Sequence, residues 1–203
     1  MYIPKIFKQE NPSEIKAFIE KNGFASLISQ VEGKPWATHI PLVWEEKNGK
    51  SVLAGHISRG NAQWRAFTDQ EQVMAIFMGP HAYVSSSWYN HENVPTWNYM
   101  AVHVYGNVRL TEGEELLASL KKLTDKYEQH SQNPVSVEGM SEKFLRNELK
   151  GLVGIEITIT DIHAVHKLSQ NRDTHNQQNI IAELEKTSDA GAHQIAQEMK
   201  KIL

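Results

Sequence analysis

The sequence of 203 residues contains no cysteine. This absence excludes disulfide bonds, zinc–thiolate centres and cysteine nucleophiles. Long apolar runs are absent as well, because residues 1–5 lack the hydrophobic stretch of a signal peptide and no segment approaches the length of a membrane span. We therefore expect a cytoplasmic protein that does not enter a membrane.

Neither sign of charge is in large excess. The 21 Lys and Arg residues face 24 Asp and Glu residues, which gives a formal net charge of −3 with histidine neutral. A protein that neutralises nucleic-acid phosphates usually carries a basic face, and no helix-turn-helix pattern stands out. Charge and motif therefore give no support to DNA as a partner, although a local basic patch leaves DNA binding open.

Recognisable metal and nucleotide motifs are also missing. His163 and His166 are three residues apart in an expected strand, which places them on opposite faces. Four further histidines lie on separate elements with no carboxylate at a ligand-like spacing: His39, His56, His81 and His103. No glycine-rich phosphate loop occurs, and Ser85–Ser87 lacks the glycines of a nucleophile elbow. We predict no metal site.

The sequence does contain a succession of strand patterns. Strands are predicted over residues 24–31, 36–44, 52–57, 73–78, 99–110 and 153–165. Asn48-Gly49 marks a hairpin turn between the second and the third. Strands in antiparallel succession with short helices between them favour a small closed barrel rather than a βαβ fold. We expect a mainly β barrel domain over residues 1–170, and a C-terminal helical segment, 171–203, that belongs to the same domain.

Helix signals interrupt these strands. Asn11 and Glu14 have the spacing of a capping box at a helix start, and Gly23 stands where a left-handed residue would end that helix. Thr111 and Glu114 predict a second capping box. Further helices are predicted over residues 141–149 and from Asn179 onward, with a break near residues 187–189.

One polar segment joins a strand end to a short helix that contains Trp64. Ser58, Arg59 and Asn61 provide a hydroxyl, a guanidinium and an amide there, and Gly60 allows close approach of the backbone. Such groups at a helix start suit a phosphate. The alternative interpretation is that Ser58 or Asn61 only caps the helix and that Arg59 is solvated.

A second polar segment directly follows the last predicted strand. It contains Lys167, Ser169, Gln170, Asn171 and Arg172. Two cations with amide and hydroxyl groups can hold an anionic or heteroaromatic ligand. A solvated turn before the C-terminal helix is the alternative.

Aromatic residues gather around one loop: Trp88, Tyr89, Trp97 and Tyr99. Tryptophan and tyrosine combine flat apolar area with a polar group, so these side chains could form the wall of a pocket for a planar ring. The alternative is an aromatic core. We assign Trp97 to the candidate cofactor site.

Eight landmarks occur in a characteristic order. They are Met1-Tyr2-Ile3-Pro4, Ala37-Thr38-His39-Ile40-Pro41, Gly55-His56-Ile57-Ser58-Arg59, Gly79-Pro80-His81-Ala82-Tyr83, Ser87-Trp88-Tyr89, Pro95-Thr96-Trp97-Asn98-Tyr99, Val102-His103-Val104-Tyr105-Gly106 and Lys167-Leu168-Ser169-Gln170-Asn171-Arg172. In this order they resemble the PaiB family of FMN-binding negative transcriptional regulators. The resemblance runs from residue 1 to about residue 185.

This resemblance implies an FMN-binding split β-barrel related to pyridoxamine-phosphate oxidases and flavin reductases. It also implies a homodimer in which both subunits touch FMN. Thr38, His39 and Ile40 would line the isoalloxazine ring through their strand backbone. A second group would flank the ring and hold the phosphate: His56, Ile57, Ser58, Arg59 and Asn61. Residues 167–172 would close the site from the partner subunit.

Two functions agree with this resemblance. The first is a regulator that represses genes for protease production and sporulation, with FMN as a sensor or structural element. The second is a flavin-dependent oxidoreductase with an indirect regulatory effect, for which His39, His56 and His103 are the acid–base candidates. Related split barrels also bind haem, which is the alternative to FMN.

Overall fold

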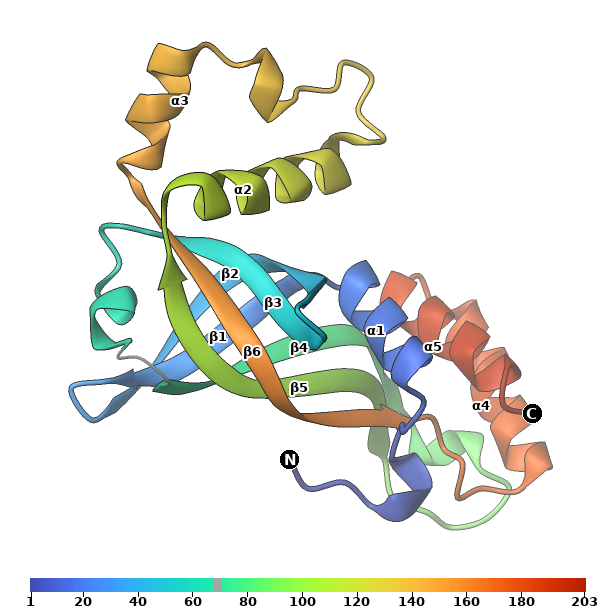
Figure 1. The fold of residues 1–203 in the computed structure, drawn as a ribbon. Helices are drawn as coiled ribbons and strands as arrows, with labels where there is room; N and C mark the ends of the chain where they lie inside the picture. The colour runs from blue at the N-terminus through green and yellow to red at the C-terminus, as the bar shows by residue number, and fades with distance from the viewer. Residues whose placement is uncertain (68–70) are drawn as a thin grey trace. The chain divides into compact units, whose positions relative to one another are not determined.

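The computed structural model describes residues 1–67 and 71–203 of the chain. Six strands are hydrogen-bonded in the order β1-β2-β3-β6-β5-β4 and form a closed barrel. The strands are β1 (Phe24–Val31), β2 (Lys34–Lys47), β3 (Lys50–Ser58), β4 (Glu71–Val84), β5 (Thr96–Thr111) and β6 (Leu152–Lys167) (Figure 1). The predicted barrel class is therefore confirmed.

Helices lie between and after the strands. The α-helices are α1 (Pro12–Lys21), α2 (Gly113–Glu128), α3 (Glu142–Leu149), α4 (Thr174–Lys186) and α5 (Ala190–Lys200). Short 3-10 helices are η1 (Lys5–Phe7), η2 (Ala62–Ala66), η3 (Ser86–Trp88) and η4 (Val137–Gly139). In the described part of the chain, no helix is both long and apolar enough to cross a membrane.

The chain divides into two compact units. Unit 1 consists of Met1–Phe18, Met78–Val102 and His163–Leu203, and unit 2 consists of Ile19–Phe77 and His103–Ile162. The predicted boundary at residue 170 stays a prediction.

The hairpins of unit 2 follow from their turn residues. Asn48 and Gly49 have φ values of 51° and 74°, as a type I′ turn requires, so the predicted hairpin between β2 and β3 is confirmed. Glu32 and Gly33, with φ values of 52° and 74°, make the same kind of turn between β1 and β2. These turns pair Val31 with Lys34 and Lys47 with Lys50, which sets the register of the two hairpins.

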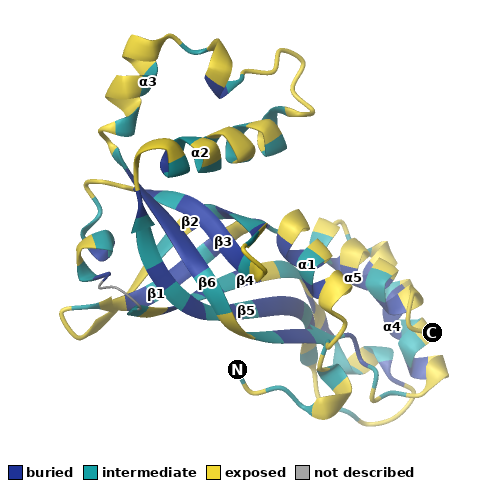
Figure 2. Ribbon diagram, in the orientation of Figure 1, coloured by how far each residue is buried: buried dark blue, intermediate teal, exposed yellow. Residues whose placement is uncertain are grey.

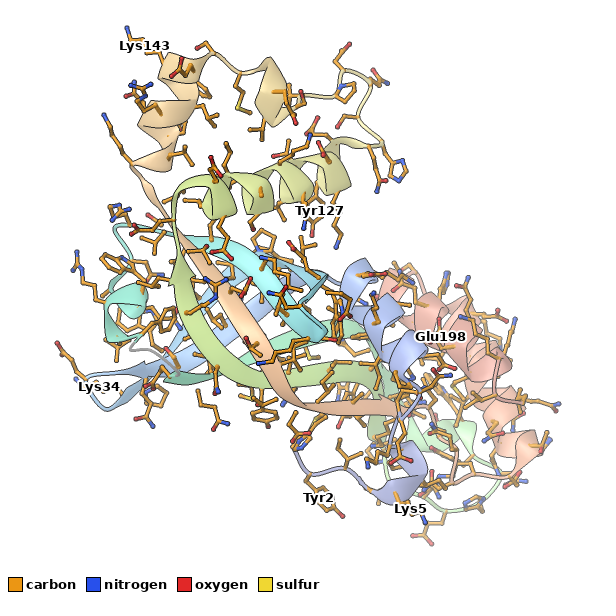
Figure 3. The ribbon with its side chains drawn as sticks, in the orientation of Figure 1. Tyr2, Lys5, Lys34, Tyr127, Lys143 and Glu198 are labelled. Carbon is orange, nitrogen blue, oxygen red and sulfur yellow. The ribbon has the colours of Figure 1, made fainter. Side chains whose placement is uncertain are left out.

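The core of unit 2 lies inside the strands. Fully buried side chains there include Leu27, Leu42, Leu53, Ile57, Ile155 and Ile157. Figure 2 shows this burial along the strands, whereas α3 is exposed almost throughout. Lys143 on α3 projects away from the chain in Figure 3. Helix α3 therefore contributes little to the core.

The predicted cap of α2 and the predicted left-handed residue after α1 are both wrong. Helix α2 begins at Gly113 with Glu112 as its N-cap and without a side-chain cap, because Thr111 is the buried last residue of β5. Gly23 does not have a positive φ. Its glycine identity has a packing reason instead, because a Cβ there would lie 2.9 Å from the Tyr127 hydroxyl and 3.2 Å from the Leu42 carbonyl oxygen.

The C-terminal helices form a pair within unit 1. Helix α4 begins at Thr174, five residues before the predicted start, because Asp173 accepts a hydrogen bond from the Asn176 amide and caps it. The predicted break is confirmed, and Asp189 caps α5 beyond it. Buried Ile180 and Leu184 of α4 and Ile195 of α5 supply the apolar contact between the helices.

Candidate cofactor-binding site

The two segments of unit 2 that are predicted to bind FMN, residues 38–40 and 56–61, are joined where β3 ends. Asn61 lies just beyond the end of β3, and its side-chain amide donates a 2.8 Å hydrogen bond to the Thr38 hydroxyl of β2. Residues that are 23 positions apart in sequence are thereby joined. The structure brings together the strand segment 38–40 and the turn after β3.

The turn from Ser58 to Asn61 is ordered by its own side chains. The Asn61 side-chain oxygen accepts from the Gln63 amide and caps η2, as the cap interpretation predicted. The Gly60 amide donates to the Ser58 hydroxyl oxygen at 3.2 Å. A Cβ on Gly60 would meet only the Ser58 hydroxyl, at 3.6 Å, so the backbone here is open to a ligand.

Arg59 is bound to the backbone where α3 leads into β6. Its Nε donates to the Lys150 carbonyl at 2.8 Å and its Nη2 donates to the Leu152 carbonyl at 2.9 Å. Arg59 is exposed, as the solvated alternative predicted, but two of its nitrogens are bound to backbone carbonyls. The prediction that Arg59 holds a phosphate stays a prediction, and within the described residues its Nη1 group has no hydrogen-bond partner.

His39 points outward from β2. Its Nδ1 lies 2.9 Å from the Ser26 hydroxyl, and its ring stacks on the exposed Phe24 ring with centroids 6.3 Å apart. Ile40 and Ile57 are 6% and 2% exposed, so only their backbone can touch a ligand. The half-buried His56 pairs with Gly154 of β6, and burial lowers the pKa of its imidazole. His56 is therefore neutral at pH 7.

The outer face of β1 and β4 is unusually apolar for the outside of a barrel. Ile28 pairs with Met74 and Ser26 pairs with Ile76, and these side chains are half-buried. Phe24 is 66% exposed at the start of β1. An apolar outer face of this kind indicates a contact surface.

The second predicted segment lies in unit 1, where two of its residues have structural partners. Ser169 is 3% exposed, and its hydroxyl exchanges hydrogen bonds with the Asn98 side chain at 2.9 and 3.1 Å. Gln170 accepts from the Leu168 amide and donates to the His166 carbonyl. Their predicted contact with FMN stays a prediction, and both side chains already hold the turn.

The two cations of this segment have neutral hydrogen-bond partners: Lys167 donates to the Thr96 hydroxyl and Arg172 donates to the Asn93 side-chain oxygen at 3.4 Å. Lys167 is half-buried, and the pKa of its amine is lowered, first by burial and then by the nearby charge of Arg172. Arg172 lies 5.2 Å from the centre of the Tyr89 ring, and Asn171 is exposed. Neither cation has a carboxylate partner in the described chain. Two neighbouring cations without an acidic partner fit an anionic group such as the FMN phosphate.

The predicted aromatic cluster divides into core and surface residues. Tyr89 is 8% exposed, whereas Trp97 is 52% exposed. Trp97 packs edge-on against Tyr83 with centroids 5.9 Å apart, and His81 lies 6.0 Å away. Trp97 is therefore a surface aromatic residue, and its predicted role at the cofactor stays a prediction.

Sequence reasoning missed Gln63, which attaches η2 to the barrel. Gln63 is fully buried, and its amide donates to the Leu27 carbonyl at 3.2 Å and to the Ser29 hydroxyl at 2.9 Å. Its position two residues after the cap Asn61 was the only signal. Across the described residues, no group of three or more His, Asp or Glu side chains is placed to hold a metal ion.

Comparisons with known proteins identify a family and a full-length relative. Residues 1–161 match the family described as "Putative FMN-binding domain". The chain is 46% identical over its full length to the protease synthase and sporulation protein PAI 2 of Bacillus subtilis (strain 168), and it covers 98% of that protein.

Solved structures show the same fold at low sequence identity. The FAD- and haem-binding protein of Mycobacterium smegmatis superposes with a TM-score of 0.62 at 15% identity, over 86% of this chain and 79% of that one. The flavocytochrome Anf3 of Azotobacter vinelandii superposes with a TM-score of 0.58 at 14% identity, over 81% and 72% of the two chains.

The barrel and the family match together define a split-barrel protein of the flavin-binding class. Within that class, the chain belongs to the PaiB family of FMN-binding split-barrel proteins.

Proposed function

We propose that the protein is a cytoplasmic, FMN-binding negative regulator of the PaiB type that affects genes for protease production and sporulation. The hydrogen bond between Asn61 and Thr38 supports the FMN part of this proposal, because it joins two segments that are predicted to bind FMN. The name of the Bacillus subtilis relative supports the regulatory part.

FMN binds along the strand backbone of residues 38–40 and against the turn from His56 to Asn61. His39 offers an exposed ring beside this strand, while Ser58 and the open backbone at Gly60 face the phosphate end. The bound flavin supplies redox or sensing chemistry. The residues of this chain orient it and bind its phosphate.

The functional unit is a homodimer. The apolar outer face of β1 and β4 is covered by a second copy, since half-buried Ile28, Met74 and Ile76 would otherwise face water. The second copy contributes Lys167, Asn171 and Arg172 to the FMN phosphate. Light scattering should give a dimer mass at micromolar concentration, and a monomer mass would remove the basis for a shared site.

The cofactor is tested by titrating protein stripped of ligand with FMN and with riboflavin. FMN should bind about ten times more tightly or better, because each charge-assisted bond to the phosphate contributes about 1.5–3 kcal/mol. Lys167→Ala should narrow the ratio between the two ligands, whereas Lys143→Ala on the exposed α3 should not. Equal affinities of the wild type for FMN and riboflavin would contradict the phosphate assignment.

A flavin oxidoreductase or a haem protein is the second candidate, favoured by solved relatives that bind FAD and haem. The absorption spectrum of the purified protein separates these functions. A flavin spectrum that does not bleach with a nicotinamide donor supports the regulator, whereas bleaching supports the oxidoreductase and a Soret band supports haem. DNA binding by this acidic chain alone is expected to be weak and salt-sensitive. A tight footprint at physiological salt would contradict that expectation.

A further inference from the structure

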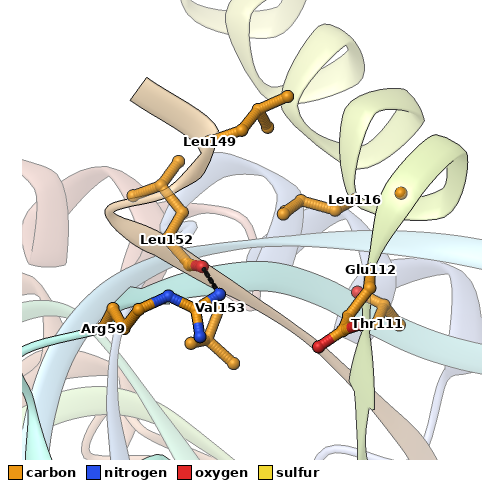
Figure 4. A pocket seen from close by; sticks show the side chains of 8 residues that line it. Arg59, Thr111, Glu112, Leu116, Leu149, Leu152 and Val153 are labelled. Carbon is orange, nitrogen blue, oxygen red and sulfur yellow. Dashed lines mark hydrogen bonds between the residues drawn. The ribbon is translucent and has the colours of Figure 1, made fainter. Parts of the chain in front are cut away.

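Arg59 fastens the turn after β3 to the junction between α3 and β6. Its main-chain amide donates to the Gly151 carbonyl at 2.8 Å, its Nε to the Lys150 carbonyl at 2.8 Å and its Nη2 to the Leu152 carbonyl at 2.9 Å. Figure 4 shows the Arg59 side chain beside Leu152, with the hydrogen bond drawn between them. Three consecutive carbonyls that follow α3 are therefore bound by one residue of the turn.

Trp64 also holds Arg59. The Trp64 indole Nε1 donates to the Arg59 carbonyl at 2.9 Å, and the Arg59 guanidinium lies 5.8 Å from the centre of the Trp64 ring. The exposed guanidinium retains its Nη1 group, which has no hydrogen-bond partner within residues 1–67 and 71–203. An anion can therefore bind to Nη1 without breaking either of the two bonds from the guanidinium to the carbonyls.

Helix α3 depends on contacts at its two ends. It has eight residues, and none of them is buried. Isolated helices shorter than about 12–15 residues are marginal in water, so α3 lacks both the length and the packing to stay folded alone. The Ser141 hydroxyl caps its first turn by accepting from the Phe144 amide. Lys150 is its C-cap residue, and the Lys150 carbonyl is bound by Arg59.

A pocket of about 280 Å³ lies beside the C-terminal end of α3. Leu149 lines it at the end of α3, Leu152 lines it at the start of β6, and Leu116 lines it from α2 (Figure 4). The last turn of α3 thus borders open space on the side of α2. The bonds to Arg59 therefore account for more of the attachment of this helix end than side-chain packing does.

We propose that FMN bound at the turn stabilises α3 through Arg59, so that α3 is ordered when FMN is present and frays when FMN is absent. This inference rests on the proposed function, in which the turn from His56 to Asn61 binds FMN. A phosphate on Nη1 fixes the Arg59 side chain, so the two carbonyl bonds no longer bear the loss of side-chain freedom that ordering an arginine costs. The exposed α3 is thus the part of the chain that signals FMN occupancy.

Hydrogen–deuterium exchange on the full-length chain, stripped of ligand, tests this coupling with peptides that cover residues 142–152. Saturating FMN should slow exchange there about fivefold or more, which is the low end of typical couplings between two sites. Riboflavin is the matched ligand control, because it lacks the phosphate, and it should leave this exchange unchanged at saturation. No slowing with FMN, or equal slowing with riboflavin, would overturn the proposal.

A pair of substitutions at the exposed Asn147 tests the reverse direction, because coupling between two sites is reciprocal. Asn147→Pro breaks α3 and should weaken FMN binding about fivefold or more without changing riboflavin binding. Asn147→Ala keeps the helix and should bind both ligands as the wild type does. Calorimetry measures the affinities, and an unchanged affinity of Asn147→Pro for FMN would overturn the proposal.

Failure of the coupling is distinguishable from failure of the proposed FMN function. If the wild type does not bind FMN, or binds FMN and riboflavin equally, the proposed function fails and the coupling fails with it. If FMN binds more tightly than riboflavin, but exchange at α3 does not slow and Asn147→Pro keeps its affinity for FMN, only the coupling is wrong.

Discussion

Unit 2 holds helix α2 through a network of ion pairs, whereas the buried polar groups of unit 1 are side-chain amides that bond to a hydroxyl, an amide and the Asp173 carboxylate. In unit 2, three carboxylates and three cations meet between α2 and the strands: Glu45, Glu115, Glu156, Lys47, Arg109 and Lys122. In unit 1, buried Asn98 bonds to Ser169, and buried Asn176 bonds to Asn90 and Asp173. Ion pairs therefore attach α2 to the strands of unit 2, whereas directional hydrogen bonds attach the segment after β6 to its neighbours in unit 1.

Glu156 is the centre of the charged network. It is 5% exposed and lies 2.6 Å from the Lys47 amine and 2.7 Å from the Arg109 guanidinium. Arg109 also bonds to Glu115, and that hydrogen bond lowers the pKa of the Glu115 carboxyl. Loss of Glu156 therefore removes the buried carboxylate that both cations share and leaves the more exposed Glu115 as their common partner.

The largest expected effect is for Glu156→Ala. We expect the free energy of unfolding to fall by about 3 kcal/mol, at the low end for buried ion pairs because both cations are partly exposed. Urea denaturation measures this change. The exposed Glu114→Ala should change stability by less than about 0.5 kcal/mol. Similar losses in the two variants would show that the network does not hold α2.

Asn98→Ala should have the next largest effect. The change removes both hydrogen bonds to the Ser169 hydroxyl and leaves that buried group unsatisfied, which costs about 1–3 kcal/mol. Urea denaturation again measures the loss, with the exposed Asn171→Ala as the control. A larger loss for Asn98→Ala than for Glu156→Ala would reverse the comparison of the units.

Ser169 provides a finer test of the geometry in unit 1. Its φ of 61° lies in the left-handed region, which non-glycine residues adopt at a cost of about 1–2 kcal/mol. Ser169→Gly and Ser169→Ala lose the same hydroxyl, but only alanine retains the strain. The glycine variant should therefore be more stable than the alanine variant by about 1 kcal/mol. Equal stability would mean that the backbone relaxes at this turn.

The sequence predicted the barrel but not these networks, for a physical reason. Alternating burial and turn residues such as Asn48-Gly49 are local, so strand positions follow from neighbouring residues. The partners of Ser169 and Glu156 lie 71 and 109 residues away, at Asn98 and Lys47, and no local pattern reports such contacts. The unit boundaries were not predicted for the same reason, since they depend on long-range packing.

For the candidate site, the sequence predicted which segments take part but not the contacts that hold them. The segments were predicted from the family resemblance and, for residues 58–61 and 167–172, from residue types that suit an anion, and the bond from Asn61 to Thr38 joins two of them. The backbone contacts of Arg59 were not found, because carbonyl acceptors such as those of Lys150 and Leu152 have no sequence signature. Thr111 was expected to cap α2, but it ends β5, and Glu112 is the N-cap residue without a side-chain cap hydrogen bond.

The smallest expected effect concerns pH, because each unit contains one histidine whose pKa is lowered by burial. In unit 1 this is His166, where the charges of Glu14 and Glu198 oppose the effect of burial. In unit 2 it is His56, where burial acts alone. The folded chain keeps both rings neutral at a pH where the unfolded chain, with pKa values near 6.5, already binds protons.

Stability should therefore be complete above about pH 6.5 and should decline as the pH falls below that value. His166→Gln and His56→Gln should each flatten this decline, and His56→Gln should flatten it more, because no carboxylate offsets its burial. Urea denaturation between pH 7.5 and 5 is the measurement, with the exposed His130→Gln as the control. If His166→Gln flattens the decline more than His56→Gln, the carboxylates of unit 1 do not protect His166.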